Sequence, residues 1–123
     1  MALFRKYAAL LAAGLALLLL AGCSTTAGAS LDASHATVID VRTATEYASG
    51  HLQGAVDVDV QASDFATKIA TYPKSGEYIV YCRSGARAGT AVTQMKAMGF
   101  TDVTNAGGID AASKATGLPI VKS

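Results

Sequence analysis

A cysteine stands between a predicted strand and a predicted helix, and this arrangement constrains the fold more than any other feature of the chain. Residues 78–81 form an apolar run, and Cys82 follows them directly. After a short loop, apolar residues recur at helical spacing from residue 88 to residue 98. A strand that leads through a short loop into a helix is typical of open α/β sheets, in which ligands bind beyond the carboxyl ends of the strands.

The surroundings of Cys82 favour a reactive thiolate over a buried structural cysteine, which is the commoner role of a lone thiol. At the start of a helix the sulfur faces unpaired backbone N–H groups and the positive end of the helix dipole. Nearby arginines favour the thiolate further, and a glycine permits a tight loop. We therefore predict that Cys82 is catalytic. The residues expected to bind an anionic substrate beside it are Arg83, Ser84, Gly85, Ala86 and Arg87.

The rest of the chain alternates between short strands and helices. Strands are predicted at residues 37–41, 55–58, 78–81 and 102–105, with a loop at 50–54 and a turn at 107–108. A short helix or turn is predicted at residues 43–48. Helices are predicted at 64–71, 87–98 and 109–116, with Ser63 capping the first of these three and Gly99 closing the second. This alternation predicts a single small α/β domain, a doubly wound parallel sheet with helices on both faces.

The first residues are typical of an export signal. Arg5 and Lys6 precede an uncharged run from residue 8 to residue 21, which is short for a membrane-spanning helix. The run ends in Leu-Ala-Gly-Cys at residues 20–23, which closely resembles a bacterial lipobox. That resemblance implies cleavage before Cys23 and lipidation of Cys23. We expect a signal peptide at 1–22, a lipidated cysteine with a flexible tether at 23–35, and the folded domain at 36–123.

Removal of residues 1–22 changes what the composition implies. It takes away Arg5 and Lys6 and leaves eight basic residues against nine acidic ones, a net charge of about −1. This balance gives no electrostatic reason to expect nucleic acid as a partner. Cys82 would then be the only free thiol in an oxidising compartment, which indicates reactivity or an intermolecular partner.

Several separated segments, in order from residue 38 to residue 121, resemble the rhodanese-like sulfurtransferase domains. They are Ile39-Asp40-Val41-Arg42, Glu46-Tyr47, the segment 50–55, the loop 82–87, Gly99-Phe100 and the segment 105–109. The resemblance implies a doubly wound α/β domain and sulfane sulfur transfer through a persulfide on the cysteine. Thiosulfate and cyanide are the familiar donor and acceptor, and no other cofactor is implied.

The resemblance also implies supporting roles near the loop. Asp40 would hold the loop through hydrogen bonds, and His51 would be structural. From the spacing of four residues we expect Arg42 to pair with Glu46. Arg83 is expected to face an anionic donor, whereas Arg87 would both shape the loop and bind the anion. A single histidine without a second ligand nearby predicts no metal site.

Two other functions are alternatives to this enzyme. Cysteine phosphatases of similar architecture have one more residue between their cysteine and arginine than the four that separate Cys82 from Arg87, and a smaller loop suits a single sulfur atom. The other alternative is a carrier or docking module that holds sulfur for a membrane partner. The strand and helix that usually precede the Asp40 segment in the family are mostly missing, because the signal and tether occupy that space, and no large aromatic residue follows Gly108. Both departures from the family pattern favour that alternative.

The expected partners are small sulfur anions or thiols, the membrane through the lipid on Cys23, and a protein that donates or accepts sulfur. The protein is expected to be a monomer. Its expected location is the bacterial cell envelope, facing the periplasm or the exterior, and Ser24 after the lipidated cysteine suits the outer membrane.

Overall fold

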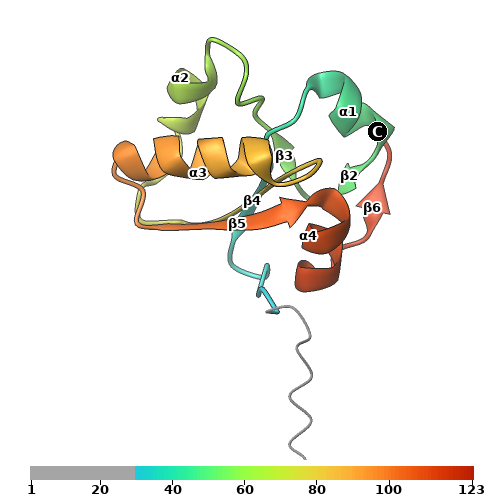
Figure 1. The fold of residues 1–123 in the computed structure, drawn as a ribbon. Helices are drawn as coiled ribbons and strands as arrows, with labels where there is room; N and C mark the ends of the chain where they lie inside the picture. The colour runs from blue at the N-terminus through green and yellow to red at the C-terminus, as the bar shows by residue number, and fades with distance from the viewer. Residues whose placement is uncertain (1–29) are drawn as a thin grey trace, which may run out of the picture.

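The computed structural model describes residues 30–123, and in it a four-stranded sheet lies between helices (Figure 1). In chain order the elements are β1 (Thr37–Asp40), α1 (Ala44–Ser49), β2 (His51–Leu52), β3 (Val56–Asp57), α2 (Phe65–Ile69), β4 (Glu77–Cys82), α3 (Ala86–Ala97), β5 (Asp102–Gly108), α4 (Ile109–Thr116) and β6 (Ile120–Val121). The main sheet has the order β3-β1-β4-β5, and every neighbouring pair in it is parallel. The predicted parallel α/β fold is confirmed.

The two faces of the sheet carry separate cores because side chains alternate along each strand. On β4, Tyr78, Val80 and Cys82 belong to one core, whereas Ile79 and Tyr81 belong to the other. Helices α2 and α3 cover the first face, with Phe65, Ile69, Ala88, Ala91 and Met95 buried against the strands. Helix α4 and Tyr47 of α1 pack on the second face, against Val38, Leu52, Ala55, Ile79 and Tyr81.

Parallel strands bring three connections to one edge of the sheet. β1 leads into α1, β4 leads into the loop before α3, and β5 leads directly into α4 (Figure 1). At the end of β5 the strand register shifts, so that Gly108 pairs with Cys82. The first residues of α3 and α4 therefore lie at the carboxyl edge of the sheet, beside the cysteine.

Three local expectations were wrong. Residues 51–52 form β2, which pairs with β6 from the far end of the chain, a contact that local sequence cannot reveal. Ser63 does not cap α2: the helix begins after Asp64, and the N–H of Phe65 bonds the carbonyl of Ala62 in a preceding turn. Residues 107–108 continue β5 rather than forming a turn.

The folded part begins before residue 36. The N–H of Leu31 donates to the carbonyl of Ala115 at 2.8 Å, and Leu31 and Ala33 pack against the second core. These residues were expected in the tether, but a large apolar side chain that reaches the end of α4 gains more from packing than from solvent exposure. The predicted signal peptide and Cys23 lie outside the described residues. Within residues 30–123, none of the helices has the length and apolarity needed to cross a bilayer.

Candidate active site

Cys82 ends β4 at the centre of the sheet, and its side chain lies under the loop that follows. The residue is fully buried. The N–H of Gly85 points back at the sulfur, with 2.9 Å between Gly85 N and Cys82 Sγ. This bend requires a left-handed backbone at Gly85, where φ is 101°, a conformation that glycine adopts without strain. The loop therefore curls over the thiol and points backbone donors at it.

Helix α3 starts directly after this bend and leaves its first N–H groups near the sulfur. Burial acts to raise the pKa of Cys82, but the backbone N–H groups of Ala88, Ser84, Gly85 and Arg87 outweigh it, so that the pKa is lowered. Because α3 carries no acidic residue in its first turn, nothing there compensates the positive end of its dipole. The site favours the thiolate, which is the nucleophilic form of cysteine.

Glycines of β5 form one wall of the loop. A Cβ on Gly108 would lie 2.5 Å from the carbonyl oxygen of Arg83, and a Cβ on Gly85 would lie 3.3 Å from the Cα of Gly107. Such backbone-to-backbone packing leaves no room for a side chain at Gly108. The loop is thus held against β5 by close contact as well as by the helix that follows it.

Asn105 on β5 fixes the same contact with hydrogen bonds, and sequence reasoning did not single it out as a site residue. Its side-chain amide donates to the carbonyl of Gly85 at 3.2 Å, while its Oδ1 accepts the N–H of Gly107 at 2.8 Å. The signal that could have found it is its place two residues before a double glycine, where an Asn side chain commonly bonds the backbone two residues on.

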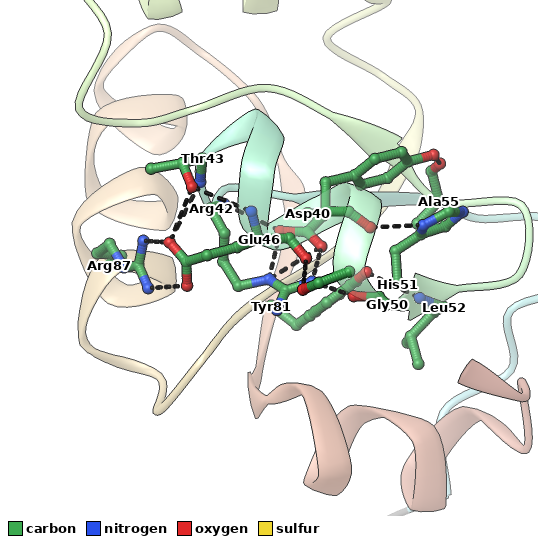
Figure 2. Close-up of polar contacts among 12 residues, drawn as sticks. Asp40, Arg42, Thr43, Glu46, Gly50, His51, Leu52, Ala55, Tyr81 and Arg87 are labelled. Carbon is green, nitrogen blue, oxygen red and sulfur yellow. Dashed lines mark hydrogen bonds and ion pairs between the residues drawn. The ribbon is translucent and has the colours of Figure 1, made fainter. Parts of the chain in front are cut away.

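The two arginines of the loop have different surroundings. Arg87 on α3 makes a two-pronged ion pair with Glu46 of α1, with Nη1–Oε1 at 2.8 Å and Nη2–Oε2 at 3.0 Å (Figure 2). Arg83 is exposed and makes no side-chain hydrogen bond or ion pair within residues 30–123. Ser84 and Ala86 are exposed as well. Of the loop's two guanidinium groups, only that of Arg83 is free for a ligand.

Glu46 also stabilises the start of α1, the helix to which it belongs. Its N–H donates to Oγ1 of Thr43 at 3.2 Å, and its carboxylate accepts the N–H of Thr43 at 3.5 Å, which completes a capping box at the start of α1. Hydrogen bonds from Arg87 first, and then from Thr43, lower the pKa of Glu46 to about 2. The carboxylate therefore stays ionised and couples α1 to the start of α3.

Arg42 does not pair with Glu46, so that expectation was wrong. Thr43 is the extended N-cap of α1, with φ −67° and ψ 159°, and Arg42 lies before the helix, where the four-residue helical spacing does not apply. Instead the buried Arg42 guanidinium bonds the Asp40 carboxylate, with Nη2–Oδ2 at 2.7 Å, and the carbonyl of Gly50 at 2.5 Å (Figure 2). The hydrogen bonds of the Asp40 carboxylate go to Arg42 and not to the cysteine loop.

Asp40 and Arg42 are linked to the candidate site through Tyr81, the residue before Cys82. The guanidinium carbon of Arg42 lies 5.8 Å from the centre of the Tyr81 ring, and the Tyr81 hydroxyl accepts the N–H of Leu52 at 2.9 Å. This buried network ties the end of β4 to β2 (Figure 2). Asp40 holds Arg42, and Arg42 contacts Tyr81, so both residues support the site structurally without contacting Cys82.

His51 is held in place by contacts with α1. Its ring stacks on Tyr47, with 3.8 Å between ring centroids, and its Nδ1 lies 2.9 Å from the carbonyl oxygen of Tyr47. The implied structural role of His51 fits these contacts. Among residues 30–123 there is no group of three or more His, Cys, Asp or Glu side chains that could hold a metal ion.

The arrangement can stabilise negative charge at and just beyond Cys82. A thiolate there can attack an electrophilic sulfur, and the N–H groups of the loop then surround the atom that it gains. Because the sulfur is fully buried under a tight loop, a bulky group has no direct access to it.

The chain is similar in sequence to a known protein family and to characterised members of it. The family model described as "Rhodanese-like domain" matches residues 25–115. Thiosulfate sulfurtransferase PspE of Escherichia coli (strain K12) is 34% identical over 84 residues, which cover 68% of this chain and 77% of that protein. Thiosulfate sulfurtransferase 16, chloroplastic, of Arabidopsis thaliana is 35% identical over 92 residues, covering 66% of this chain and 76% of that protein.

Solved structures agree with the family match. A structure titled "rhodanese with anions from E. coli" superposes with a TM-score of 0.59 at 32% identity, over 71% of this chain and 98% of the other. The Alr3790 protein from Anabaena gives a TM-score of 0.64 at 29% identity, over 72% of this chain and 69% of the other. With its parallel sheet and its cysteine loop at the carboxyl edge, the chain belongs to the rhodanese-like domain family.

Proposed function

We propose that this protein is a sulfurtransferase that carries sulfane sulfur as a persulfide on Cys82. One observation carries the proposal: the sulfur of Cys82 lies under the N–H of Gly85, with further loop N–H groups lowering the pKa of the thiol. Two curated relatives that bear the name thiosulfate sulfurtransferase support it. Arg83 would attract the anionic donor, because it is the unpaired cation next to the nucleophile.

The reaction has two balanced steps. The Cys82 thiolate attacks the sulfane sulfur of thiosulfate, an S–S bond forms, and the S–S bond of the donor breaks to release sulfite. The terminal sulfur of the Cys82 persulfide then transfers to a thiophilic acceptor. When cyanide is the acceptor, thiocyanate leaves and the Cys82 thiolate is restored. Loop N–H groups stabilise the negative charge on the persulfide between the two steps.

Turnover tests this proposal. The purified wild-type protein should release thiocyanate from thiosulfate and cyanide, and Cys82→Ser should release none above the uncatalysed rate. Exposed Ser75→Ala is the control, because it removes a hydroxyl before β4, outside the Cys82 loop, and it should turn over like the wild type. Wild-type protein that is folded yet releases no thiocyanate would rule out turnover with this pair.

A carrier is the second candidate, and the complete burial of Cys82 favours it. A loop that covers the sulfur would slow release to a small acceptor and reserve the persulfide for a partner that engages the loop. In that case Cys82 gains sulfur from a donor, but cyanide does not remove it. Sulfur gain on Cys82 and thiocyanate release, measured on the same protein preparation, distinguish the carrier from the enzyme.

Attachment to the cell envelope is a further part of the proposal. Lipid on Cys23 would anchor the domain on the outer side of a bacterial membrane, and several acyl chains together would hold it stably. The proposed partners are therefore small sulfur anions, thiols or a protein facing the periplasm or cell exterior. Cys23→Ser should move the protein from the membrane fraction to the soluble one, and the fatty acids on the wild-type N-terminal peptide should be visible by mass spectrometry.

A further inference from the structure

The bend at Gly85 places a backbone donor on the Cys82 sulfur, but nothing within Gly85 itself fixes that bend. Gly85 is the N-cap of α3, with φ 101° and ψ −18°, and as a glycine it has no side chain to bond the first turn of the helix. A residue without a Cβ moves between left-handed and other backbone conformations at little cost. The 2.9 Å contact between Gly85 N and Cys82 Sγ therefore depends on neighbours that hold Gly85.

The carbonyl oxygen of Gly85 accepts two hydrogen bonds, which come from two different elements. The N–H of Gly89 donates at 2.9 Å, and this bond belongs to the first turn of α3. The side-chain amide of Asn105 donates from β5 at 3.2 Å. Of these two bonds, only the one from Asn105 ties Gly85 to the sheet. It therefore helps to fix where the bend lies relative to the end of β4, where Cys82 stands.

Asn105 is itself held in one orientation. Its Oδ1 accepts the N–H of Gly107, two residues on, at 2.8 Å. A carboxamide has its oxygen on one side and its NH2 group on the other, so the bond from Gly107 turns the NH2 group toward Gly85. Gly107 is left-handed, with φ 82°, and lies in the stretch where the register between β4 and β5 shifts. A local turn of β5 thus directs the Asn105 donor at the loop.

The bond from Asn105 has no equivalent elsewhere in the loop. Within residues 30–123, Asn105 is the only residue outside the loop whose side chain bonds the backbone of residues 83–85. The side chain of Asn105 is exposed, and a neutral hydrogen bond at an exposed position contributes little to the stability of the whole fold. Its effect should therefore fall on the loop, and through Gly85 on the sulfur.

We propose that Asn105 is a positioning residue for sulfur transfer, which keeps the Gly85 N–H on the Cys82 sulfur by holding the Gly85 carbonyl. This inference rests on the proposed sulfur transfer through Cys82. The hydrogen bonds of the Asn105 amide go to Gly85 and Gly107 and not to the sulfur, so it acts through the backbone. Without the amide the bend loosens, and the sulfur loses a hydrogen bond that favours the thiolate.

The test follows thiolate formation at Cys82 in the reduced full-length protein in detergent. Thiolates absorb ultraviolet light where thiols do not, and subtraction of the same pH titration in a Cys82→Ser background isolates the signal of Cys82. Below the wild-type pH midpoint of thiolate formation, we expect the thiolate fraction to fall about fivefold in Asn105→Ala, as the loss of one hydrogen bond implies.

Sulfur gain from thiosulfate, measured by intact mass, gives the second readout. Its rate constant in Asn105→Ala should be lower than in the wild type below both pH midpoints. Above both midpoints every Cys82 is a thiolate, and the rate constant should reach at least the wild-type value, because a thiolate of higher pKa is the better nucleophile.

Gln94→Ala is the matched control. Gln94 also carries an exposed side-chain amide, on α3, but this amide makes no hydrogen bond among the described residues. Its replacement should leave the pH midpoint unchanged. Far-UV circular dichroism checks that Asn105→Ala folds. If it does not, Asn105→Asp keeps the oxygen that accepts the Gly107 N–H but offers no donor to Gly85. The fall in thiolate fraction should then persist at about 1 M salt, which screens the added charge.

The outcomes separate the role of Asn105 from the proposed function. A folded Asn105→Ala with the wild-type pH midpoint would overturn the role of Asn105 while sulfur transfer stands. A lower melting temperature without a change in that midpoint would do the same, because a residue that only supports the fold behaves in this way. A folded wild-type protein that gains no sulfur would overturn the proposed function itself, whatever the midpoint.

Discussion

At the scale of single residues, two carboxyl groups meet where β1 and β3 end. Asp40 and Asp57 are register partners in neighbouring parallel strands, and Asp40 is fully buried. Asp57 has a buried Oδ1 without a hydrogen-bond partner in the described part of the chain. Burial first, and then the charges of Asp40 and Asp59, raise the pKa of Asp57 to about 6. The fold therefore binds a proton there more tightly than the unfolded chain does.

Asp57→Asn should consequently stabilise the protein in a pH-dependent way. The ionised carboxylate destabilises the fold above its folded pKa of about 6, and this cost disappears below the ordinary value of 3.8. We expect the variant to gain about 1 kcal/mol in the free energy of unfolding at pH 8, with the gain declining to nearly nothing at pH 3.5. Urea unfolding across this range measures it. A gain that is the same at pH 3.5 and at pH 8 would contradict this account of Asp57.

Tyr81→Phe should weaken the structural support behind Cys82. The Tyr81 hydroxyl accepts the N–H of Leu52 at 2.9 Å in a fully buried place, so its removal leaves a buried donor unpaired. We expect a loss of about 1–3 kcal/mol in the free energy of unfolding. Tyr72→Phe is the control, because Tyr72 is only partly buried. Equal stability of the two variants in thermal melts would contradict the role given to Tyr81.

At the scale of elements, the position of the loop after Cys82 depends on how closely β5 packs against it. Gly108→Ala would place a Cβ 2.5 Å from the backbone carbonyl oxygen of Arg83, and because the backbone fixes the position of a Cβ, no side-chain rotation can relieve the clash. We expect about 1–3 kcal/mol of destabilisation and a large loss of sulfur transfer, because the loop must move off Cys82.

Gly89→Ala provides the comparison for that variant. Gly89 lies within α3, where an added Cβ makes ordinary contact, at 3.6 Å, with the Asn105 side chain. Alanine at this position should leave sulfur transfer intact and stabilise the protein by up to about 1 kcal/mol, because glycine is a poor helix former. If both variants behave alike, the close contact between Gly108 and the loop is not what holds the site.

The sequence could predict features that depend on residues near one another in the chain, but not features that depend on residues far apart. The β4–loop–α3 unit around Cys82 is encoded locally, by an apolar run, a glycine and helical spacing, and it was predicted to within a residue or two. The ion-pair partner of Glu46 was not predicted, because Arg87 is 41 residues away and only the parallel sheet brings α1 beside α3. The pairing of β2 with β6 and the contact of Asn105 with Gly85 are likewise tertiary.

At the scale of the whole molecule, the second core includes residues from near both ends of the described region. Leu31 and Leu118 pack against the face that α4 covers. The chain before β1 is therefore part of the fold, although it forms no strand, and the boundary of the folded domain lies closer to residue 30 than to residue 36.

A pair of truncations tests that boundary. A variant that begins at Asp32 lacks Leu31, with its apolar contacts and its N–H bond to Ala115, and should lose about 1–2 kcal/mol in the free energy of unfolding. A variant that begins at Ser30 keeps both interactions and should match the full-length protein. Equal stability of the two variants would place residue 31 in the tether.

The central claim is that Cys82 carries the transferred sulfur, and intact mass measures this most directly. Full-length protein, reduced and then exposed to a persulfide or thiosulfate donor, should gain the mass of one sulfur atom. The added sulfur should be lost on reduction, and Cys82→Ser should gain none. A folded wild-type protein whose mass does not change with either donor, or a Cys82→Ser variant that gains the same mass, would contradict the account.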